Sequence, residues 1–480
     1  MALGIDIVAD GIRCSQLREN DLTHSQKYGV LGLVPRRDEP LVWNNPRALR
    51  LSSPGPYISL SQIWDKFMSD ADGRTSWEWE SIEGFADKRS TANLIVDSII
   101  QNFDKTKQKR TIFSIDNTLN EFQQEALIKS LRSGGVSKSE LLWRPIAIAM
   151  YYLNSVGRDE FDEGDRLIIA DLDSYLPEVT VLNLKYLRDE LVPVRDLPSK
   201  ENLIDDVYSS YRLKYEFVKH ITENKKDIID QLLKGPFSNE FISFLEGKSN
   251  NDIWLHNGLS YNAFKVNTDW RNKIADFEVD GINFEELRDS IWEDNDLESD
   301  DIILWNGFPC RIQNSDIYDE NEIVLPDIAV SSGAADYAQR REENRPTYLD
   351  TLPGLQILSE VGGTGHHKMF DVILKGEVEG GKTERIPKPL TQFKLEKDAE
   401  IFTSVLHNVS EGTYKKIETE IPVHKYDEDV PVIINAEMRP ANGNALVTIE
   451  GAKDYGDVFG RQKMIKLDWR KMEDFEFDDY

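Results

Sequence analysis

An acidic bend is the first feature of this sequence that could do chemistry. Residues 168–182, IIADLDSYLPEVTVL, place Asp171, Asp173 and Pro177 between two β-rich runs, and the bend contains no glycine. Neighbouring carboxylates in a loop suit a catalytic site. Aspartate and proline between two apolar runs are also typical of an ordinary turn. The residues alone leave both interpretations open.

Two motifs in the C-terminal part suggest phosphate or metal chemistry, but each is better explained as a turn. GEVEGGKT, residues 376–383, satisfies the P-loop formula, yet Pro387 and Pro389 forbid the helix that must follow it, so we expect a β-hairpin tip. His366 and His367 would point to opposite faces of a strand, and no cysteine or carboxylate cluster stands at ligand spacing. We therefore predict no metal site.

The hydrophobic pattern predicts the elements that position the bend. The chain starts as a β-hairpin around Asp10-Gly11. RTIFSID reads as a strand, and the following segment as a helix that Asn120 caps and Gln123 supports in a capping box. ELLWRPIAIAMYYLNSVG predicts a short strand and a helix opened by Pro145. The acidic bend then closes a second hairpin.

The rest of the chain changes character twice. Residues 199–300 look mostly helical and strongly charged. DDIILWNGFPC predicts a buried strand running into a turn, and DIAVSSGAADYAQRREEN a helix of small residues. After Arg345-Pro346 we expect alternating short β runs, with turns suited to Gly380-Gly381, Asn408 and Ala441-Asn442-Gly443.

Composition limits the classes of partner. The 480 residues carry 57 basic and 86 acidic side chains, a net charge of −29, which would repel phosphate backbones and anionic lipid. We therefore expect no nucleic-acid and no membrane partner. Two cysteines make no disulfide framework, and neither a signal peptide nor an apolar run of membrane-spanning length is present, so we expect a cytoplasmic protein.

The order of these segments resembles the seventy-kilodalton heat-shock chaperone family. LGIDIVADG is similar to the family's first phosphate hairpin, GIDLGTT, and LIIADLDSYLPEVTVL to its second, FDLGGGTFDVS. DFEVDGINFEELRDSIW is similar to its R-x-x-F-E-E-L helix, and IILWNGFPCRI with PDIAVSSGAADYA to its adenosine segment. The resemblance covers nearly the whole chain.

The resemblance implies an α/β actin-like ATPase fold with two lobes, followed by an all-β sandwich domain. It implies an actin-like nucleotide-binding-type domain in residues 1–345, with a helical insert at about 199–300, and a β-sandwich peptide- or protein-binding-type domain without a helical lid in 346–480. We predict an accessible linker at residues 345–352. A lidless sandwich would exchange an extended peptide quickly.

The family's cofactors are ATP and Mg²⁺, and the matched positions here are altered. The nucleotide positions that remain are Gly4, Asp6, Asp171, Asn306, Gly307 and Gly333, and the remnants of catalytic positions are Asp6, Asp171, Arg144 and Glu178. Asp173, Ser174 and Tyr175 replace three glycines, so side chains fill the space for phosphate, and Asp173 would set anion against anion.

Arg144 falls where the family has the carboxylate that organises water. Arginine cannot act as a base at neutral pH. It could pair with Asp6 and Asp171 as an internal substitute for the metal, or simply face solvent before Pro145. The small residues around Asn306, Gly307 and Gly333 either retain weak nucleotide binding or only pack a strand against a helix.

Two functions follow from the resemblance. The first is a chaperone-like protein-binding or scaffold module with little or no ATP hydrolysis, which binds a protein or extended peptide through the β-sandwich. The alternative is an active ATP-dependent chaperone with unusual phosphate loops. We favour the first because the glycines of the phosphate loops are missing.

Overall fold

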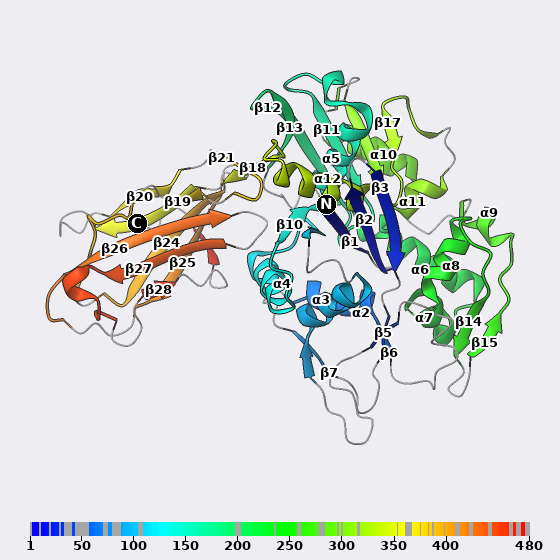
Figure 1. Cartoon of the computed structure of the whole chain (residues 1–480), viewed down its shortest axis with the longest axis horizontal. Coiled ribbons are helices and arrows are strands. Elements are labelled where there is room, and N and C mark those ends of the chain that lie inside the picture. Colours follow the sequence, from blue (N-terminus) through cyan, green and yellow to red (C-terminus); the bar gives the residue numbers. More distant parts are fainter. Residues whose placement is uncertain are drawn as a thin grey trace. The chain divides into compact units, whose positions relative to one another are not determined.

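The computed structural model divides into two compact units. The first contains Met1–Pro193 and Lys200–Thr347, and the second Val194–Ser199 and Tyr348–Tyr480 (Figure 1). The structure describes residues 2–8, 11–18, 21–27, 30–32, 41–43, 57–70, 75–78, 88–103, 109–196, 203–234, 237–256, 261–275, 277, 284–294, 297–298, 301–313, 317–352, 354–360, 367–374, 376–382, 384–385, 388–397, 399–408, 413–421, 426–439, 444–459, 464–466 and 472–475.

The first sheet of the first unit has the strand order β10-β9-β1-β2-β3. Its strands are β1 (Ala2–Val8), β2 (Gly11–Arg18), β3 (Asp21–Lys27), β9 (Arg110–Ile115) and β10 (Ser139–Trp143). β1 pairs antiparallel with β2 and parallel with β9, and β9 pairs parallel with β10. The predicted N-terminal hairpin and the strand RTIFSID are confirmed, but Gly11, expected in the turn, is the first residue of β2 and pairs with Val8. The third antiparallel strand, β3, was not predicted, because DLTHSQK has a mostly polar pattern.

A second sheet in the same unit repeats this order. Five of the seven strands of this sheet have the order β17-β16-β11-β12-β13, with β11 (Arg166–Asp171), β12 (Glu178–Leu187), β13 (Glu190–Arg195), β16 (Ile302–Asn306) and β17 (Glu322–Val324). β11 pairs antiparallel with β12 and parallel with β16, which pairs parallel with β17. In the first sheet and in these five strands of the second, the first strand along the chain therefore lies between an antiparallel hairpin partner and a parallel strand.

Helices follow the strands in both halves of the unit. They are α2 (Leu60–Met68), α3 (Thr91–Asn102), α4 (Glu121–Ser133), α5 (Arg144–Val156), α10 (Phe284–Asp294), α11 (Phe308–Ile312) and α12 (Ala329–Glu342). The predicted capping box at the start of α4 is confirmed, since Asn120 accepts from the backbone N–H of Gln123 and the Gln123 side chain accepts from that of Asn120. α12 packs against α5 and β1. The turn expected after β16 is wrong, because residues 308–312 form the short helix α11.

The predicted insert is mostly helical in its described part. It contains α6 (Ser210–Ile221), α7 (Lys226–Lys234), α8 (Ser238–Leu245) and α9 (Trp270–Ala275), together with the hairpin β14 (Ile253–His256) and β15 (Tyr261–Phe264). These elements share a core around Phe217, Phe241 and Phe244. The smaller strands of the unit are β4 (Val30–Gly32), β5 (Leu41–Trp43), β6 (Tyr57–Ser59), β7 (Ser76–Glu78) and β8 (Lys88–Ser90).

The second unit is rich in β-structure. One sheet runs β20-β19-β24-β25-β29, and another β22-β26-β27-β28 with β23 beside β26. The strands are β18 (Leu349–Leu352), β19 (Gly354–Glu360), β20 (His367–Ile373), β21 (Gly376–Glu379), β22 (Glu384–Arg385), β23 (Lys394–Leu395), β24 (Ile401–Asn408), β25 (Thr413–Glu420), β26 (Val430–Arg439), β27 (Asn444–Gly451), β28 (Met464–Lys466) and β29 (Met472–Phe475). Alternate residues of β26 are buried, as expected of a strand with one face on a core.

Three predictions in this region have different outcomes. The P-loop formula at residues 376–383 is not a hairpin tip, because β21 pairs with β18 whereas β22 pairs with β26. The accessible linker is wrong beyond Arg345, since residues 346–350 are buried and residues 349–352 form β18. The turn predicted at 441–443 and the histidine at 366 lie outside the described residues. No helix in the described part of the chain is long and apolar enough to cross a membrane.

Candidate functional site

The predicted site residues stand at the ends of elements from both sheets of the first unit. Asp6 lies on β1 opposite Arg13 of β2. Asp171 is the last residue of β11, opposite Glu178 of β12 and beside Asn306 of β16. Arg144 begins α5 directly after β10. The central strands of the two sheets thus each supply one carboxylate, and the helix between them supplies the guanidinium.

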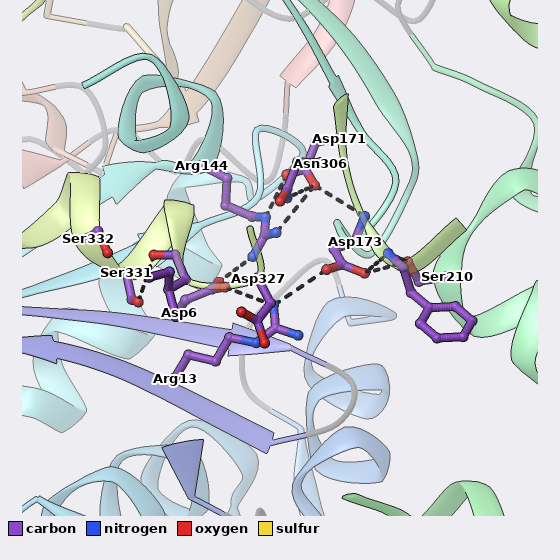
Figure 2. A network of polar contacts seen from close by, with 12 residues as sticks. Asp6, Arg13, Arg144, Asp171, Asp173, Ser210, Asn306, Asp327, Ser331 and Ser332 are labelled. Atoms are coloured by element: carbon purple, nitrogen blue, oxygen red, sulfur yellow. Dashed lines mark hydrogen bonds and ion pairs between the residues drawn. The ribbon is translucent and has the colours of Figure 1, made fainter. Parts of the chain in front are cut away.

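The guanidinium of Arg144 is buried and contacts three carboxylates. Its Nε lies 2.7 Å from Oδ2 of Asp171, its Nη2 donates to Oδ1 of the same residue at 3.3 Å, and its Nη1 donates to Asp6. Asp116, just after β9, adds a third carboxylate 3.5 Å from Nε. Only 1% of Arg144 is exposed. The predicted pairing with Asp6 and Asp171 is confirmed, and the solvent-facing alternative is wrong (Figure 2).

Burial and charge act in opposite directions on these groups. The pKa of Asp6 is raised, because complete burial outweighs the favourable charges of Arg144 and Arg13. Burial also raises the pKa of Asp116 to about 6, against the opposing effect of Arg144. The pKa of Arg144 is raised well above its usual value, since Asp171, Asp6 and Asp116 together outweigh the desolvation of the guanidinium. One guanidinium therefore holds three carboxylates that it cannot fully neutralise.

Asp173 is the centre of a second cluster with the opposite charge pattern. It accepts from the Ser210 hydroxyl and, at 3.3 Å, from the backbone N–H of Phe308. Arg13 lies 3.4 Å and Arg311 3.3 Å from its Oδ2. Burial by itself would raise the pKa of Asp173, but Arg311, Arg13, Lys214 and the Ser210 hydrogen bond hold it well below its usual range. Figure 2 shows Arg13 between the two clusters.

The acidic bend therefore forms hydrogen bonds and ion pairs within the protein, and its backbone N–H groups do not form an anion-binding loop. The backbone N–H of Asp173 donates to Oδ1 of Asp171 at 3.1 Å, and that of Tyr175 donates to Asp116 at 3.2 Å. The Ser174 hydroxyl donates to the carbonyl of Asp171 at 3.1 Å. Backbone donors of the bend are thus used within the protein.

The matched small residues serve close packing. A Cβ on Gly4 would lie 2.0 Å from the carbonyl oxygen of Ser331, and one on Gly333 would lie 1.7 Å from that of Ala147. Gly307 has a φ of +145°, and a Cβ there would meet Leu172 at 2.9 Å. These contacts favour the interpretation that the small residues pack strands against helices.

The two remaining matched residues are also inside the protein. Asn306 donates from Nδ2 to Oδ1 of Asp171 at 2.8 Å and so supports the Arg144 cluster. Glu178 is buried on β12, opposite Asp171 in the strand register. Asn306 therefore positions a carboxylate, and Glu178 lies on the strand that follows the bend.

Sequence reasoning missed Asp116, Arg13 and Arg311. Arg13 lies on the second strand of the predicted hairpin, but the expected turn at Asp10-Gly11 would place Ser15 opposite Asp6, whereas Arg13 is opposite Asp6 in the structure. Asp116 ends the predicted strand RTIFSID, and the carboxyl ends of strands often carry functional side chains. Arg311 lies on α11, which is too short for a periodic pattern.

Comparison with known proteins gives no family for this chain. No protein-family model matches it, and none of the curated proteins matches it.

Proposed function

We propose that the chain is a heat-shock-chaperone-like protein without an ATP cycle, which acts as a protein-binding or scaffold module. In this proposal the first unit has an actin-like fold with two lobes, and the second is a β-sandwich. The repeated strand order supports the first assignment, because two sheets with the same central strand, hairpin and parallel pair are expected of a duplicated two-lobe fold. The two sheets of the second unit are compatible with a sandwich.

The observation that carries the proposal is the environment of Arg144. Its guanidinium pairs with Asp6 from the first sheet and with Asp171 from the second, and these are the two carboxylates that the family resemblance assigns to the nucleotide site. A buried guanidinium is always charged and cannot accept a proton from water. General-base activation of water at this position is therefore absent from the proposed function.

The residues present do not fit Mg·ATP. A divalent cation near Asp6 and Asp171 would lie beside a guanidinium that both carboxylates already bind. A phosphate at the bend would meet the carboxylate of Asp173, which already takes the Ser210 hydroxyl and the backbone N–H of Phe308. The guanidinium of Arg144 thus occupies the position of the metal cation, and the carboxylate of Asp173 that of a phosphate.

The same contacts suggest a static role for the first unit. The pair of ionic contacts from Arg144 joins the two sheets directly, and Arg13 of the first sheet pairs with Asp173 of the second. A family member that opens and closes around nucleotide needs these surfaces to separate. Here separation would leave buried charges unpaired, which costs several kcal/mol in order of magnitude. The proposed module therefore stays in one conformation while its β-rich unit binds protein or extended peptide.

Thermal melting with and without Mg·ATP tests the proposal. If nucleotide bound, a hundredfold excess over its dissociation constant would stabilise the fold by about 2.7 kcal/mol and raise the melting temperature. Because the proposal includes no nucleotide binding, we expect an unchanged melting temperature. Magnesium alone and ADP serve as matched additions. A parallel assay should find no ATP hydrolysis above a blank without protein. Turnover that disappears in Asp171→Ala would instead support the alternative, an active ATP-dependent chaperone.

The binding half of the proposal needs its own measurement. Fluorescence anisotropy of a labelled extended peptide, titrated with the full chain, should show saturable binding that ATP does not change. Release of the peptide on addition of Mg·ATP would contradict a module without an ATP cycle, and absence of binding to a panel of unfolded peptides would remove the chaperone-like role.

A further inference from the structure

A cavity opens beside the two charge clusters, and Asp116 of the first cluster and Asp173 of the second contribute to its lining. Its volume is about 330 Å³, at the lower end of the range for small-molecule sites. Among the described residues, three aromatic side chains and four carboxylates line it: Trp64, Tyr175, Tyr211, Asp65, Asp116, Asp173 and Asp206. Trp64 and Asp116 are buried, whereas Asp65, Asp206 and Tyr211 are exposed. The cavity therefore has an acidic floor at Asp116 and an acidic, aromatic mouth.

The Asp116 carboxylate has one oxygen left for a ligand. Oδ1 accepts from the backbone N–H of Tyr175 and faces Arg144, while Oδ2 makes no hydrogen bond within the described part of the chain and stays accessible from the cavity. Asp116 itself is only 3% exposed. A carboxylate oxygen that is open to a cavity and bound by no protein donor can accept a hydrogen bond from a cationic ligand.

The negative potential extends across the cavity. The pKa of Tyr175 is raised, first by partial burial and then by the charges of Asp65 and Asp116. Arg144 shares its single charge among three carboxylates and cannot neutralise Asp116 by itself. A second positive charge would therefore be stabilised here, and an anion would be repelled.

Lys214 is the cationic side chain among the described lining residues, and it serves the Asp173 cluster. Its Nζ lies 4.7 Å from the ring centroid of Phe308, and its charge lowers the pKa of Asp173, for which burial is the largest, opposing influence. Lys214 is buried. The net charge of the side chains at the mouth of the cavity and at Asp116 is therefore negative.

We propose that this cavity binds an aliphatic ammonium ion, with the ammonium group at Oδ2 of Asp116 and the aliphatic stem between the aromatic side chains. Carboxylates satisfy the three donors of an ammonium, and aromatic faces favour both its charge and its apolar stem. The exposed Leu176 adds apolar surface at the mouth. A diamine fits best, because its second ammonium can reach Asp65 or Asp206. The inference does not depend on the proposed function.

The same chemistry could come from a free diamine or from a lysine side chain of a protein. Isothermal titration of the full chain with 1,4-diaminobutane and with Nα-acetyl-lysine amide distinguishes the two sources, and the tighter binder identifies the source. The titrations are run at an ionic strength of about 0.15 M, so that general attraction to an acidic protein is screened. Butan-1-ol and Mg²⁺ test whether the stem or the charge suffices alone, and weak or absent binding is expected for both.

Two variants and a control locate the binding. Asp116→Asn keeps the shape and removes the charge, and it should weaken diamine binding by about tenfold or more. Leu176→Lys places an ammonium at the mouth from the protein itself and should compete with the ligand. Asp159→Asn, an exposed acid away from the cavity, should change nothing. Absence of saturable binding at about 10 mM amine, or affinity unchanged in both cavity variants, would overturn the proposal.

Discussion

The two buried charge clusters of the first unit are near mirror images. In one, the guanidinium of Arg144 faces three carboxylates, with Arg13 a more distant second cation 3.9 Å from Asp6. In the other, a single carboxylate, Asp173, faces two guanidiniums, a hydroxyl and a backbone N–H. Burial is nearly complete in both. The pKa values nevertheless move in opposite directions, since those of Asp6 and Asp116 are raised and that of Asp173 is lowered.

The comparison teaches that the ratio of charges, more than burial, decides whether a buried acid stabilises the fold. When several buried carboxylates share one cation, its attraction offsets only part of their desolvation free energy. A carboxylate with two cations and neutral donors is compensated fully.

Removing the shared cation should have the largest effect. Arg144→Ala leaves three buried carboxylates without their common partner, and we expect a loss of about 4 kcal/mol in the free energy of unfolding. Chemical denaturation measures it. Arg212→Ala is the matched control, because Arg212 forms an exposed ion pair with Glu216 on α6 and should cost less than about 0.5 kcal/mol. A midpoint equally insensitive to both changes would break the comparison.

The pH dependence of Asp116 should be nearly as large. Its pKa in the folded state is about 6, above the usual value of 3.8, so the folded state binds the proton more tightly than the unfolded state. The contribution of Asp116 is then most favourable below about pH 4 and is lost as the pH rises through 6. Relative to wild type, Asp116→Asn should gain about 3 kcal/mol between pH 4 and pH 7. For Asp159→Asn, at an exposed position, the difference in unfolding free energy from wild type should not change between pH 4 and pH 7.

How much of this was readable from the sequence depends on the distance along the chain between partners. The contact of Arg144 with Asp6 and Asp171 was predicted, because the family resemblance places all three residues at one site, on strand β1, at the start of helix α5 and at the end of strand β11. The Asp173 cluster was not, because Ser210 and Arg311 come from the insert and from a five-residue helix. The local hydrophobic pattern of a sequence does not indicate which side chains from distant segments will contact a given bend.

The unit boundary shows the same limit. The composition change near residue 345 is visible in the sequence, and the compact units divide between Thr347 and Tyr348. That residues 194–199 belong with the second unit is not visible, because Val194 and Arg195 pair with Leu349 and Asp350, which lie 155 residues further along the chain. A short strand segment carries no mark of so distant a partner.

Neutralising Asp173 should lower the free energy of unfolding by less than removing the guanidinium of Arg144. Asp173→Asn removes the charge that Arg13 and Arg311 share, and we expect a loss of about 2 kcal/mol at pH 7. The pKa of Asp173 is held below its usual range, so its charge stabilises the fold above the unfolded pKa, and this contribution is lost as the pH falls through the lower folded pKa. The penalty of the variant should therefore shrink below about pH 4. A penalty that grows on acidification would reverse the assignment.

The smallest effect should come from a neutral donor of the second cluster. The Ser210 hydroxyl donates to Asp173 and accepts from the backbone N–H of Phe308 at 3.1 Å. Ser210→Ala removes both bonds, but the Phe308 N–H also reaches Asp173 at 3.3 Å, so no buried backbone donor is left alone. We expect a loss of about 1 kcal/mol, against almost none for Ser155→Ala, whose exposed hydroxyl only bonds its own helix.

A double-mutant cycle sharpens this last prediction, because charge is what distinguishes the two clusters. If the hydroxyl acts by stabilising the ionised carboxylate, Ser210→Ala should cost little once Asp173→Asn has removed that charge, and the coupling energy should approach about 1 kcal/mol. It should also fall with acidification, since protonated Asp173 needs the hydroxyl less. Additive losses at every pH would mean that Ser210 only fills space beside α11, and that the cationic partners alone keep Asp173 ionised.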